Sequence, residues 1–457
     1  MLLGPVFDRF VAATPVAVAT RGLLERALAA PALDALFGRT AQTQYTRDLL
    51  FSTCVDLMGS VVCRVQRSLH AAYSADAQRV GVSVKALYDK INHVEPTVAA
   101  ELVRHTAKVL EPIIRAMGGE RPPLLPGYRV KILDGNHLAR TERRPKILRD
   151  VAAGPLPGQT LVVLDPPLGL ALDVVCCEDG HAQERSLMDR ILPTVSKLDL
   201  WIADRNFCTT GILFGIAWRK GYFLIRQHAS TLRWTRESKR RAKGRTDTGK
   251  LFEQTLWLEN DGAVLRVRRI TLVLDTPTRD GETEIHLLTN LSARAATAAT
   301  VAKLYRERWT IEGLFLTLTT VLQCEVKTLA YPKAALFGFC VALASSNVSA
   351  TVKASLRAAH GHELVDAEVS DYYLADELSG TYRGMMIAIP AEEWGIFATL
   401  STKKLAELLV ALARGVRLSR FQKHKRGPKK PKPRRTRFAK KKHIATSRLL
   451  NGTMNEK

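Results

Sequence analysis

Three side chains that could act together on a phosphate lie within residues 304–312. In Leu304-Tyr-Arg-Glu-Arg-Trp-Thr-Ile-Glu312, Tyr305, Arg308 and Glu312 stand at i, i+3 and i+7, positions that share one face of a helix. A carboxylate can hold a metal ion, a guanidinium can bind a phosphate, and an aromatic ring can contact a displaced base. A surface helix with an ordinary Arg308–Glu312 ion pair, worth roughly 0.3 kcal/mol, would show the same spacing.

Two aspartates upstream favour the metal-binding interpretation. Val130-Lys-Ile-Leu-Asp134 and Leu200-Trp-Ile-Ala-Asp204 each read as a short apolar strand that ends on an aspartate. Parallel neighbouring strands place their last residues at one edge of a sheet. We therefore expect Asp134, Asp204 and Glu312 to form an oxygen-rich site for two Mg²⁺ ions, where Mn²⁺ could take their place. Two ions about 4 Å apart can activate the attacking oxygen and stabilise the leaving oxygen of a phosphodiester.

These three acids and their surroundings resemble the DDE transposases of bacterial insertion sequences, and more narrowly the insertion sequence 4 family. In that family the glutamate lies in a Tyr-x2-Arg-x3-Glu-x6-Lys signature, which Tyr305, Arg308 and Glu312 match at its spacing. The lysine position is Thr319, so the match is incomplete. The resemblance runs over most of the chain. It implies a ribonuclease H-like core and cut-and-paste transposition of DNA.

The resemblance also implies roles for individual residues. Asp134, Asp204 and Glu312 would hold the two ions, while activated water nicks the transposon end and the freed 3′-hydroxyl attacks target DNA. Arg308 would bind a phosphate near the cleaved end, and Tyr305 would contact DNA close to a flipped base. The departure at Thr319 affects one phosphate contact and, with it, the efficiency of a hairpin step.

Two further expectations concern DNA and assembly. Arg205, which follows the second aspartate, is predicted to contact DNA. Thr319 lies two helical turns beyond Glu312, so we expect it to point along the bound strand. The family acts as a synaptic dimer, which implies a homodimer on DNA whose partners are the terminal inverted repeats and the target.

The hydrophobic pattern predicts the elements that position these residues. Strands are expected at 129–133, 160–164, 170–176, 200–203 and 222–225, with helices at 183–192 and 209–220. As the resemblance implies, this is the order of a ribonuclease H-like core, an α/β fold with a mixed sheet flanked by helices. Its first and fourth strands would be adjacent and parallel. Asp165 is a rival ligand, but it ends the antiparallel second strand and is expected to be a turn residue at the opposite edge.

Composition divides the chain further. Residues 82–97 read as a helix, a turn and a second helix capped by Thr97, either a DNA-reading unit or an ordinary packed pair. The predicted domains are a helical N-terminal DNA-binding domain (1–125), the first part of the core (126–227), a β-rich insertion (228–295), the last helix of the core (296–332), a helical C-terminal region (333–413) and a basic, disordered tail (414–457).

The charge indicates a polyanionic partner. The formal net charge is +24 and the sequence pI is about 9.9, which suits nucleic acid or an anionic membrane surface. Residues 414–442 carry 15 Lys/Arg and no acid. Lys429, Lys430, Arg434 and Arg435 in this tail are predicted to bind DNA phosphates, the alternative being a solubilising tail. Residues 236–245 are also basic and could follow a DNA backbone or form a solvated loop.

Other features of the sequence concern the cellular location of the protein, the state of its cysteines and its alternative functions. The apolar run 335–344 is too short to span a bilayer and no signal peptide is evident, so a bacterial cytoplasm, close to the nucleoid, is expected. The seven cysteines lack zinc-site spacing and are predicted to be reduced core thiols. Two other functions stay open. One is a ribonuclease H-like nuclease without strand transfer, and the other is a non-catalytic DNA-binding derivative of a transposase.

Overall fold

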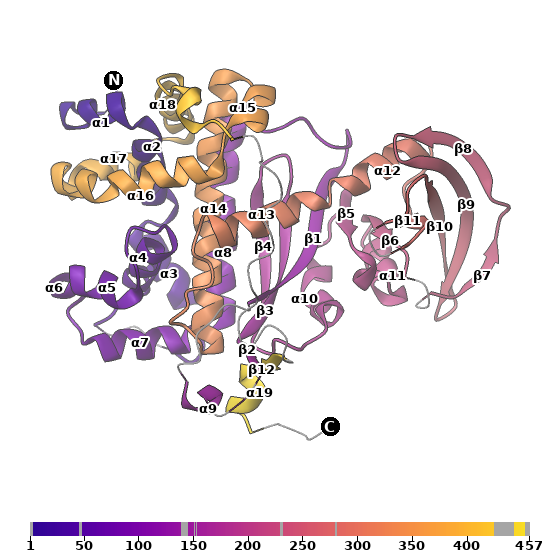
Figure 1. The fold of residues 1–457 in the computed structure, drawn as a ribbon, viewed down its shortest axis with the longest axis horizontal. Coiled ribbons are helices and arrows are strands. Elements are labelled where there is room, and N and C mark those ends of the chain that lie inside the picture. The colour runs from indigo at the N-terminus through magenta and orange to yellow at the C-terminus, as the bar shows by residue number, and fades with distance from the viewer. Residues whose placement is uncertain are drawn as a thin grey trace.

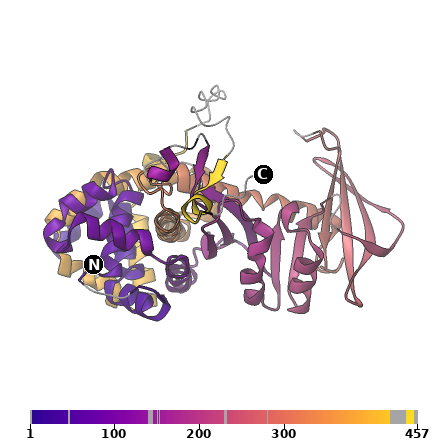
Figure 2. The ribbon, with the colours of Figure 1, turned by 90° about the horizontal axis from the view of Figure 1, so that it is seen from below.

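The computed structural model describes residues 3–44, 48–138, 145–149, 151, 153–228, 232–278, 281–424 and 443–452. Helices from both ends of the chain gather at one end of an elongated molecule, and a sheet extends from them to the other end (Figures 1 and 2). The helices of the first region are α1 (Asp8–Ala13), α2 (Pro15–Ala27), α3 (Ala30–Thr40), α4 (Phe51–Val62), α5 (Leu69–Ala75), α6 (Ala77–Val80), α7 (Val84–His93) and α8 (Pro96–Met117).

A ten-stranded mixed sheet forms the centre, with the order β4-β3-β1-β5-β6-β11-β10-β9-β7 and β8 paired to β9. Its first five strands are β1 (Arg129–Leu138), β3 (Gly158–Asp165), β4 (Leu170–Cys177), β5 (Asp199–Ala203) and β6 (Tyr222–Arg226). β3 is antiparallel to β1 and β4, whereas β1, β5 and β6 are parallel. The α/β class, the five predicted strands and the parallel pairing of the first and fourth strands are confirmed.

β1 is longer than predicted. It continues beyond Asp134 to Leu138, because β3 pairs with it as far as Leu138 opposite Gly158. Its parallel pairing with β5 stops earlier, at Leu133 opposite Ala203. Asp134 therefore does not end its strand, but it is the first residue of β1 without a partner on the β5 side.

The strands of residues 228–295 continue the same sheet. They are β7 (Trp234–Glu237), β8 (Arg241–Thr246), β9 (Gly249–Asn260), β10 (Ala263–Leu274) and β11 (Glu284–Thr289). β11 is antiparallel to β6 and to β10, which joins the insertion to the core edge to edge. The insertion is thus an extension of the sheet beyond the core strands β1, β5 and β6 (Figure 1).

Helices cover the sheet. Between the strands lie α9 (Lys146–Arg149), α10 (Met188–Ile191) and α11 (Thr210–Trp218); after them come α12 (Ala298–Arg306), α13 (Trp309–Thr320), α14 (Pro332–His360), α15 (His362–Glu368), α16 (Asp371–Ala388), α17 (Gly395–Thr399) and α18 (Thr402–Arg414). α8 and α14 pack against each other and against β4. Five of the seven cysteines are buried, as expected of core thiols.

The apolar run at residues 335–344, which was expected to be too short to span a bilayer, is part of the longer helix α14. The helix has 29 residues, and among the described residues it is the one long and apolar enough to cross a membrane. In this fold 89% of its most apolar window is buried inside the protein, against α8, α18 and the sheet. The packing of a core helix accounts for its composition.

Residues 82–97 contain α7 and the start of α8, and α7 packs against α14. Thr97 does not cap the second helix as predicted, because α8 begins at Pro96 and Glu95 occupies the N-cap position. The Glu95 carboxylate instead accepts hydrogen bonds from the backbone of Gln42 and Thr43. Within residues 98–107 of α8, seven positions are buried and Glu101, Arg104 and His105 are partly exposed.

The basic tail is partly ordered, contrary to expectation. Phe421, in a short helix (Leu418–Phe421), is buried. Strand β12 (His443–Ala445) pairs with β2 (Gly154–Leu156), and Leu449 of α19 (Thr446–Leu450) packs with Leu148 and Ala330. These apolar side chains anchor both ends of the segment. Residues 425–442, which include Lys429, Lys430, Arg434 and Arg435, lie outside the described residues.

Candidate active site

The register of β1 and β5 places the two aspartates side by side. Their last pair is Leu133 with Ala203, so Asp134 and Asp204 are the next residues on the two parallel strands. One oxygen of each carboxylate is held locally. Asp134 Oδ1 accepts from the Gly135 backbone N–H at 3.0 Å, and Asp204 Oδ1 accepts from that of Asn206 at 2.8 Å. The second oxygen of each is left for other partners.

Glu312 comes from a helix that is interrupted where one continuous helix was predicted. α12 ends at Arg306 and α13 begins at Trp309, and between them the N–H groups of Glu307 and Arg308 bond to carbonyls three residues back. Such a 3₁₀ turn tightens the chain locally. α12 lies against the β-rich insertion and α13 against β1 (Figure 1).

Arg308 joins two of the three predicted acids. Its Nη1 donates to Asp134 Oδ2 at 2.9 Å and its Nη2 donates to Glu312 Oε1 at 2.7 Å. The Arg308 side chain is only 13% exposed, and within the described part of the chain its buried Nε has no acceptor. The i,i+4 pair of an ordinary surface helix is present, but its arginine is largely buried and also pairs with a strand residue.

Burial is the largest cause of the pKa shifts of Asp134 and Tyr305. It raises the pKa of Asp134 to about 6; Arg308 opposes this shift, and Asp204 and Glu184 add to it. Burial also raises the pKa of Tyr305 to about 12. A carboxylate that is costly to ionise, next to further carboxylates, provides the donor chemistry that a hard cation needs.

The acids do not yet form a complete metal shell. Within the described ranges, no three His, Cys, Asp or Glu side chains stand close enough to hold an ion. Asp134 and Glu312 are both hydrogen-bonded to Arg308, whose guanidinium lies between them. The donor set fits Mg²⁺ by its chemistry, and binding requires Arg308 to leave one or both carboxylates.

Two neighbours of the site were missed by the sequence reasoning. Glu184, the first residue of a short helix (Glu184–Leu187), accepts from Asn206 Nδ2 at 3.3 Å. Trp309 is 64% exposed, and the Arg308 guanidinium carbon lies 5.6 Å from its ring centroid. For Trp309, the available signal in the sequence was its position next to the signature arginine. Glu184 lies far from the other acids in sequence, and no sequence pattern pointed to it.

The other predicted DNA-binding residues differ in their availability. Arg205 is half exposed, and its Nη1 lies 3.3 Å from Glu282 Oε1. Thr319 is half-buried, and its hydroxyl donates to the carbonyl oxygens of Phe315 and Leu316 at 3.0 and 3.1 Å. That hydroxyl hydrogen is therefore used within its own helix.

Two cavities border residues that contact the acids. One of about 910 Å³ is lined by Tyr305, Arg308 and Trp309 together with apolar residues of β10 and β11. Another of about 360 Å³ is polar and is lined by residues that include Glu184 and Arg205.

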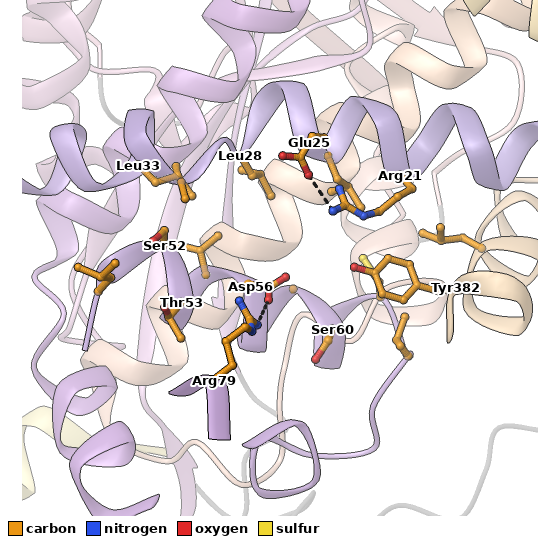
Figure 3. Close-up of a pocket in the computed structure, with 18 residues that line it drawn as sticks. Arg21, Glu25, Leu28, Leu33, Ser52, Thr53, Asp56, Ser60, Arg79 and Tyr382 are labelled. Atoms are coloured by element: carbon orange, nitrogen blue, oxygen red, sulfur yellow. Dashed lines mark hydrogen bonds and ion pairs between the residues drawn. The ribbon is translucent and has the colours of Figure 1, made fainter. Parts of the chain in front are cut away.

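A third cavity, of about 450 Å³, lies among α2, α4 and α16 (Figure 3). It is separate from the candidate site, since it is lined neither by the three acids nor by Tyr305, Arg308, Glu184 or Arg205. The charged groups at its edge already pair with each other, Arg79 with Asp56 and Arg21 with Glu25.

Comparison with known families bears on this geometry. Residues 158–348, less than half of the chain, match the family model described as the transposase DDE domain. The match supports a transposase function. The matched segment contains Asp204, Arg308 and Glu312 and begins after Asp134, whose place in the site rests on the strand register. No match was found among curated proteins.

Proposed function

We propose that the protein is a DNA transposase that moves an insertion sequence by cutting its ends and joining them to target DNA. One observation carries the proposal. In a chain whose residues 158–348 match the transposase DDE domain, Asp134 and Asp204 are the next residues after the last pair of two parallel strands, and Arg308 connects Glu312 to Asp134. The spacing of Tyr305, Arg308 and Glu312 supports membership of the insertion sequence 4 family, with Thr319 in place of its lysine.

Asp134, Asp204 and Glu312 would hold two Mg²⁺ ions, or Mn²⁺. When bound, such ions activate an attacking oxygen and stabilise a leaving oxygen. Asp204, fixed by the Asn206 N–H, would orient one carboxylate at the end of β5. Glu312 is 42% exposed and would be the most mobile of the three ligands.

Arg308 would change partners during the reaction. Without DNA it neutralises Asp134 and Glu312. An incoming phosphate offers the guanidinium a second anion, and its unpaired Nε can donate to it. Moving toward the phosphate would release the two carboxylates. Metal binding would thus be favoured when DNA is present.

The remaining groups would follow the DNA. Tyr305 and Trp309 line a cavity beside the acids that could receive an unstacked base. Arg205 and Thr319 would lie along the strand. Lys429, Lys430, Arg434 and Arg435 would bind backbone phosphates, in keeping with the net charge of +24. We also propose a homodimer that holds two transposon ends, acting in a bacterial cytoplasm.

Alanine variants test the proposal. Replacing Asp134, Asp204 or Glu312 should abolish Mg²⁺-dependent cleavage of a DNA end while leaving end binding largely intact, since most binding energy comes from other contacts. Terminal repeats taken from the DNA that flanks the gene would supply the substrate. Asp165→Ala is the matched control and should still cut, because this carboxylate serves a turn by accepting from the Leu168 N–H at 2.9 Å.

The products separate the proposal from its alternatives. Joined products in a plasmid assay require strand transfer, which a simple nuclease does not perform. Cleavage without joining would favour the nuclease. An intact wild-type protein that binds ends but never cuts them would favour the non-catalytic derivative. Near-normal cleavage by any one of the three variants would remove that residue from the metal site.

A further inference from the structure

The outer strands of the insertion carry a row of three side chains that the proposed site does not use. In the register of β7, β9 and β10, Arg236 and Arg266 each lie opposite Trp257, one from either neighbouring strand. The Arg236 guanidinium carbon stands 4.7 Å from the centroid of the Trp257 ring. Arg236 belongs to the basic segment 236–245, most of which lies in β7 and β8. These strands form the end of the sheet opposite the N-terminal helices (Figure 1).

The row lies on an open face of the sheet. Successive residues of a strand point to opposite faces, so Leu256 and Leu258 point away from the side of Trp257. Both leucines are buried and pack in one cluster with α11. On the side of the row, Arg236 and Arg266 are exposed and Trp257 is half-buried. The face that carries the row is therefore accessible to a large partner at this end of the sheet.

The arginines of these strands differ in their partners. Arg268, two residues along β10 from Arg266, is buried and its Nε lies 2.9 Å from Glu253 Oε1. On the opposite face, Arg269 Nη2 lies 3.6 Å from Glu237 Oε2. Neither arginine of the row forms an ion pair with any residue that the structure describes. The fold thus neutralises the neighbouring arginines and leaves the charges of the row to solvent.

We propose that the row of Arg236, Trp257 and Arg266 binds the phosphate backbone of duplex DNA independently of its sequence. The inference rests on the proposed function, because it takes DNA as the polyanion. Guanidinium groups bind phosphates with paired hydrogen bonds, and the ring beneath Arg236 holds that side chain in place before DNA arrives. Glu259 on the same face brings one negative charge against these two positive ones.

The geometry of the sheet favours backbone contacts over contacts to bases. Three strands side by side are wider than the two-stranded ribbon that the major groove admits. β7 and β10 are separated by one strand, so the two arginines start roughly 10 Å apart and can contact separate phosphates. Phosphate contacts carry no direct information about sequence. The structural alternative is that the arginines only cover the ring of Trp257.

The double variant Arg236→Gln/Arg266→Gln tests the proposal. Binding should weaken, and the slope of log affinity against log salt should become shallower by about 1.8, at roughly 0.9 per phosphate contact. The change should be the same for a transposon end and for an unrelated duplex of equal length. Fluorescence anisotropy with each labelled DNA at several salt concentrations measures the slopes. The melting temperature should stay close to that of the wild type, because both side chains are exposed.

Two controls accompany this measurement. Arg236→Lys/Arg266→Lys keeps both charges and should keep most of the slope, which a purely structural role does not predict. Lys250→Gln removes an exposed charge from the opposite face of β9 and should leave the slope unchanged. If the double glutamine variant unfolds, Arg266→Gln alone should lower the slope by about 0.9.

Three results would overturn the inference. They are an unchanged slope in the folded glutamine variant, an equal change per charge in Lys250→Gln, and a loss confined to the transposon end. Failure of the transposase proposal is read separately, from the absence of cleaved and joined DNA ends. A protein that binds duplex DNA through this row without ever cutting it would separate the two proposals.

Discussion

At the scale of single residues, the chemistry depends on a cation that the protein itself supplies. Arg308 contributes the positive charge between Asp134 and Glu312. A largely buried carboxylate without such a partner would be protonated or would destabilise the fold. The same guanidinium competes with any metal ion for the same oxygens. We therefore expect the DNA-free protein to bind divalent ions less tightly than the DNA-bound protein.

Arg308→Gln separates these two effects. Without the competing guanidinium, the DNA-free variant should bind Mn²⁺ about tenfold more tightly than the wild type, a difference of about 1.4 kcal/mol. Cleavage of DNA ends should nevertheless fall, since a phosphate contact is lost. Calorimetric Mn²⁺ titration and a cleavage assay measure the two results. Arg306→Gln, which removes an exposed arginine paired with Asp247, is the control. Weaker Mn²⁺ binding in Arg308→Gln would contradict the competition.

Asp165 gives a prediction about pH. Burial raises its pKa to about 6, above the value of about 3.9 for an unfolded aspartate, so folding favours its protonated form. That stability is fully present below a pH of about 4 and is lost as the pH rises through 6. Asp165→Asn keeps the acceptor for the Leu168 N–H and should raise the free energy of unfolding by about 1–2 kcal/mol at pH 8, with little effect near pH 4. Urea denaturation at both pH values measures the difference. An equal effect at both would rule out ionisation as the cause.

At the scale of elements, the strands could be predicted and the contacts between distant elements could not. Alternating and continuous apolar runs indicated five core strands, because their period follows from the pleat of a sheet. The interruption at Glu307 and Arg308 left no mark in the helical pattern, since one 3₁₀ turn keeps the apolar spacing. The contact between Glu184 and Gly135 depends on how η2 (Glu184–Leu187) returns over β1, which is set by tertiary packing. The sequence therefore indicated Asp134, Asp204 and Glu312 as candidates, but gave no sign that Glu184 lies over Gly135.

α13 carries a prediction at Thr319. Because its hydroxyl already bonds to carbonyls of its own helix, Thr319→Ala should change DNA binding little. Thr319→Lys should strengthen binding to a cleaved end and steepen the plot of log affinity against log salt by about 0.9, one phosphate contact. Thr320→Lys adds the same charge at an exposed neighbouring position and should have a smaller effect. End-binding titrations at several salt concentrations, with a melting curve for each variant, test this. A lysine variant that melts early and binds no better would place Thr319 against protein.

At the scale of the whole molecule, the chain is strongly basic and folds into a helical end and an extended sheet. Two cavities border residues next to the core acids, one lined by Tyr305, Arg308 and Trp309 and the other by Glu184 and Arg205. Composition alone gives the net charge of +24, and this charge predicts a polyanionic partner. The anchoring of the C-terminal end on β2 could not, because three residues of strand and one buried leucine give too short a pattern.

That anchoring changes how the basic tail should be tested. Deletion from Arg414 onward would also remove Phe421, β12 and α19, whose packing belongs to the folded protein. Replacing Lys429, Lys430, Arg434 and Arg435 with Gln removes four charges and leaves these anchors in place.

If all four side chains contact duplex phosphates, the slope of log affinity against log salt should become shallower by about 3.6, at roughly 0.9 per contact. The melting temperature should stay the same, since no anchor is touched. Fluorescence anisotropy with a labelled DNA end from low to physiological salt measures the slope. A variant with Gln at the exposed Lys403 and Lys404 of α18, which removes two charges at the helical end of the molecule, controls for net charge when the slope change is compared per charge removed. If the two variants change the salt slope by the same amount per charge removed, the tail acts through the overall electrostatic field of the protein. An unchanged slope in the tail variant would mean that these residues do not touch DNA.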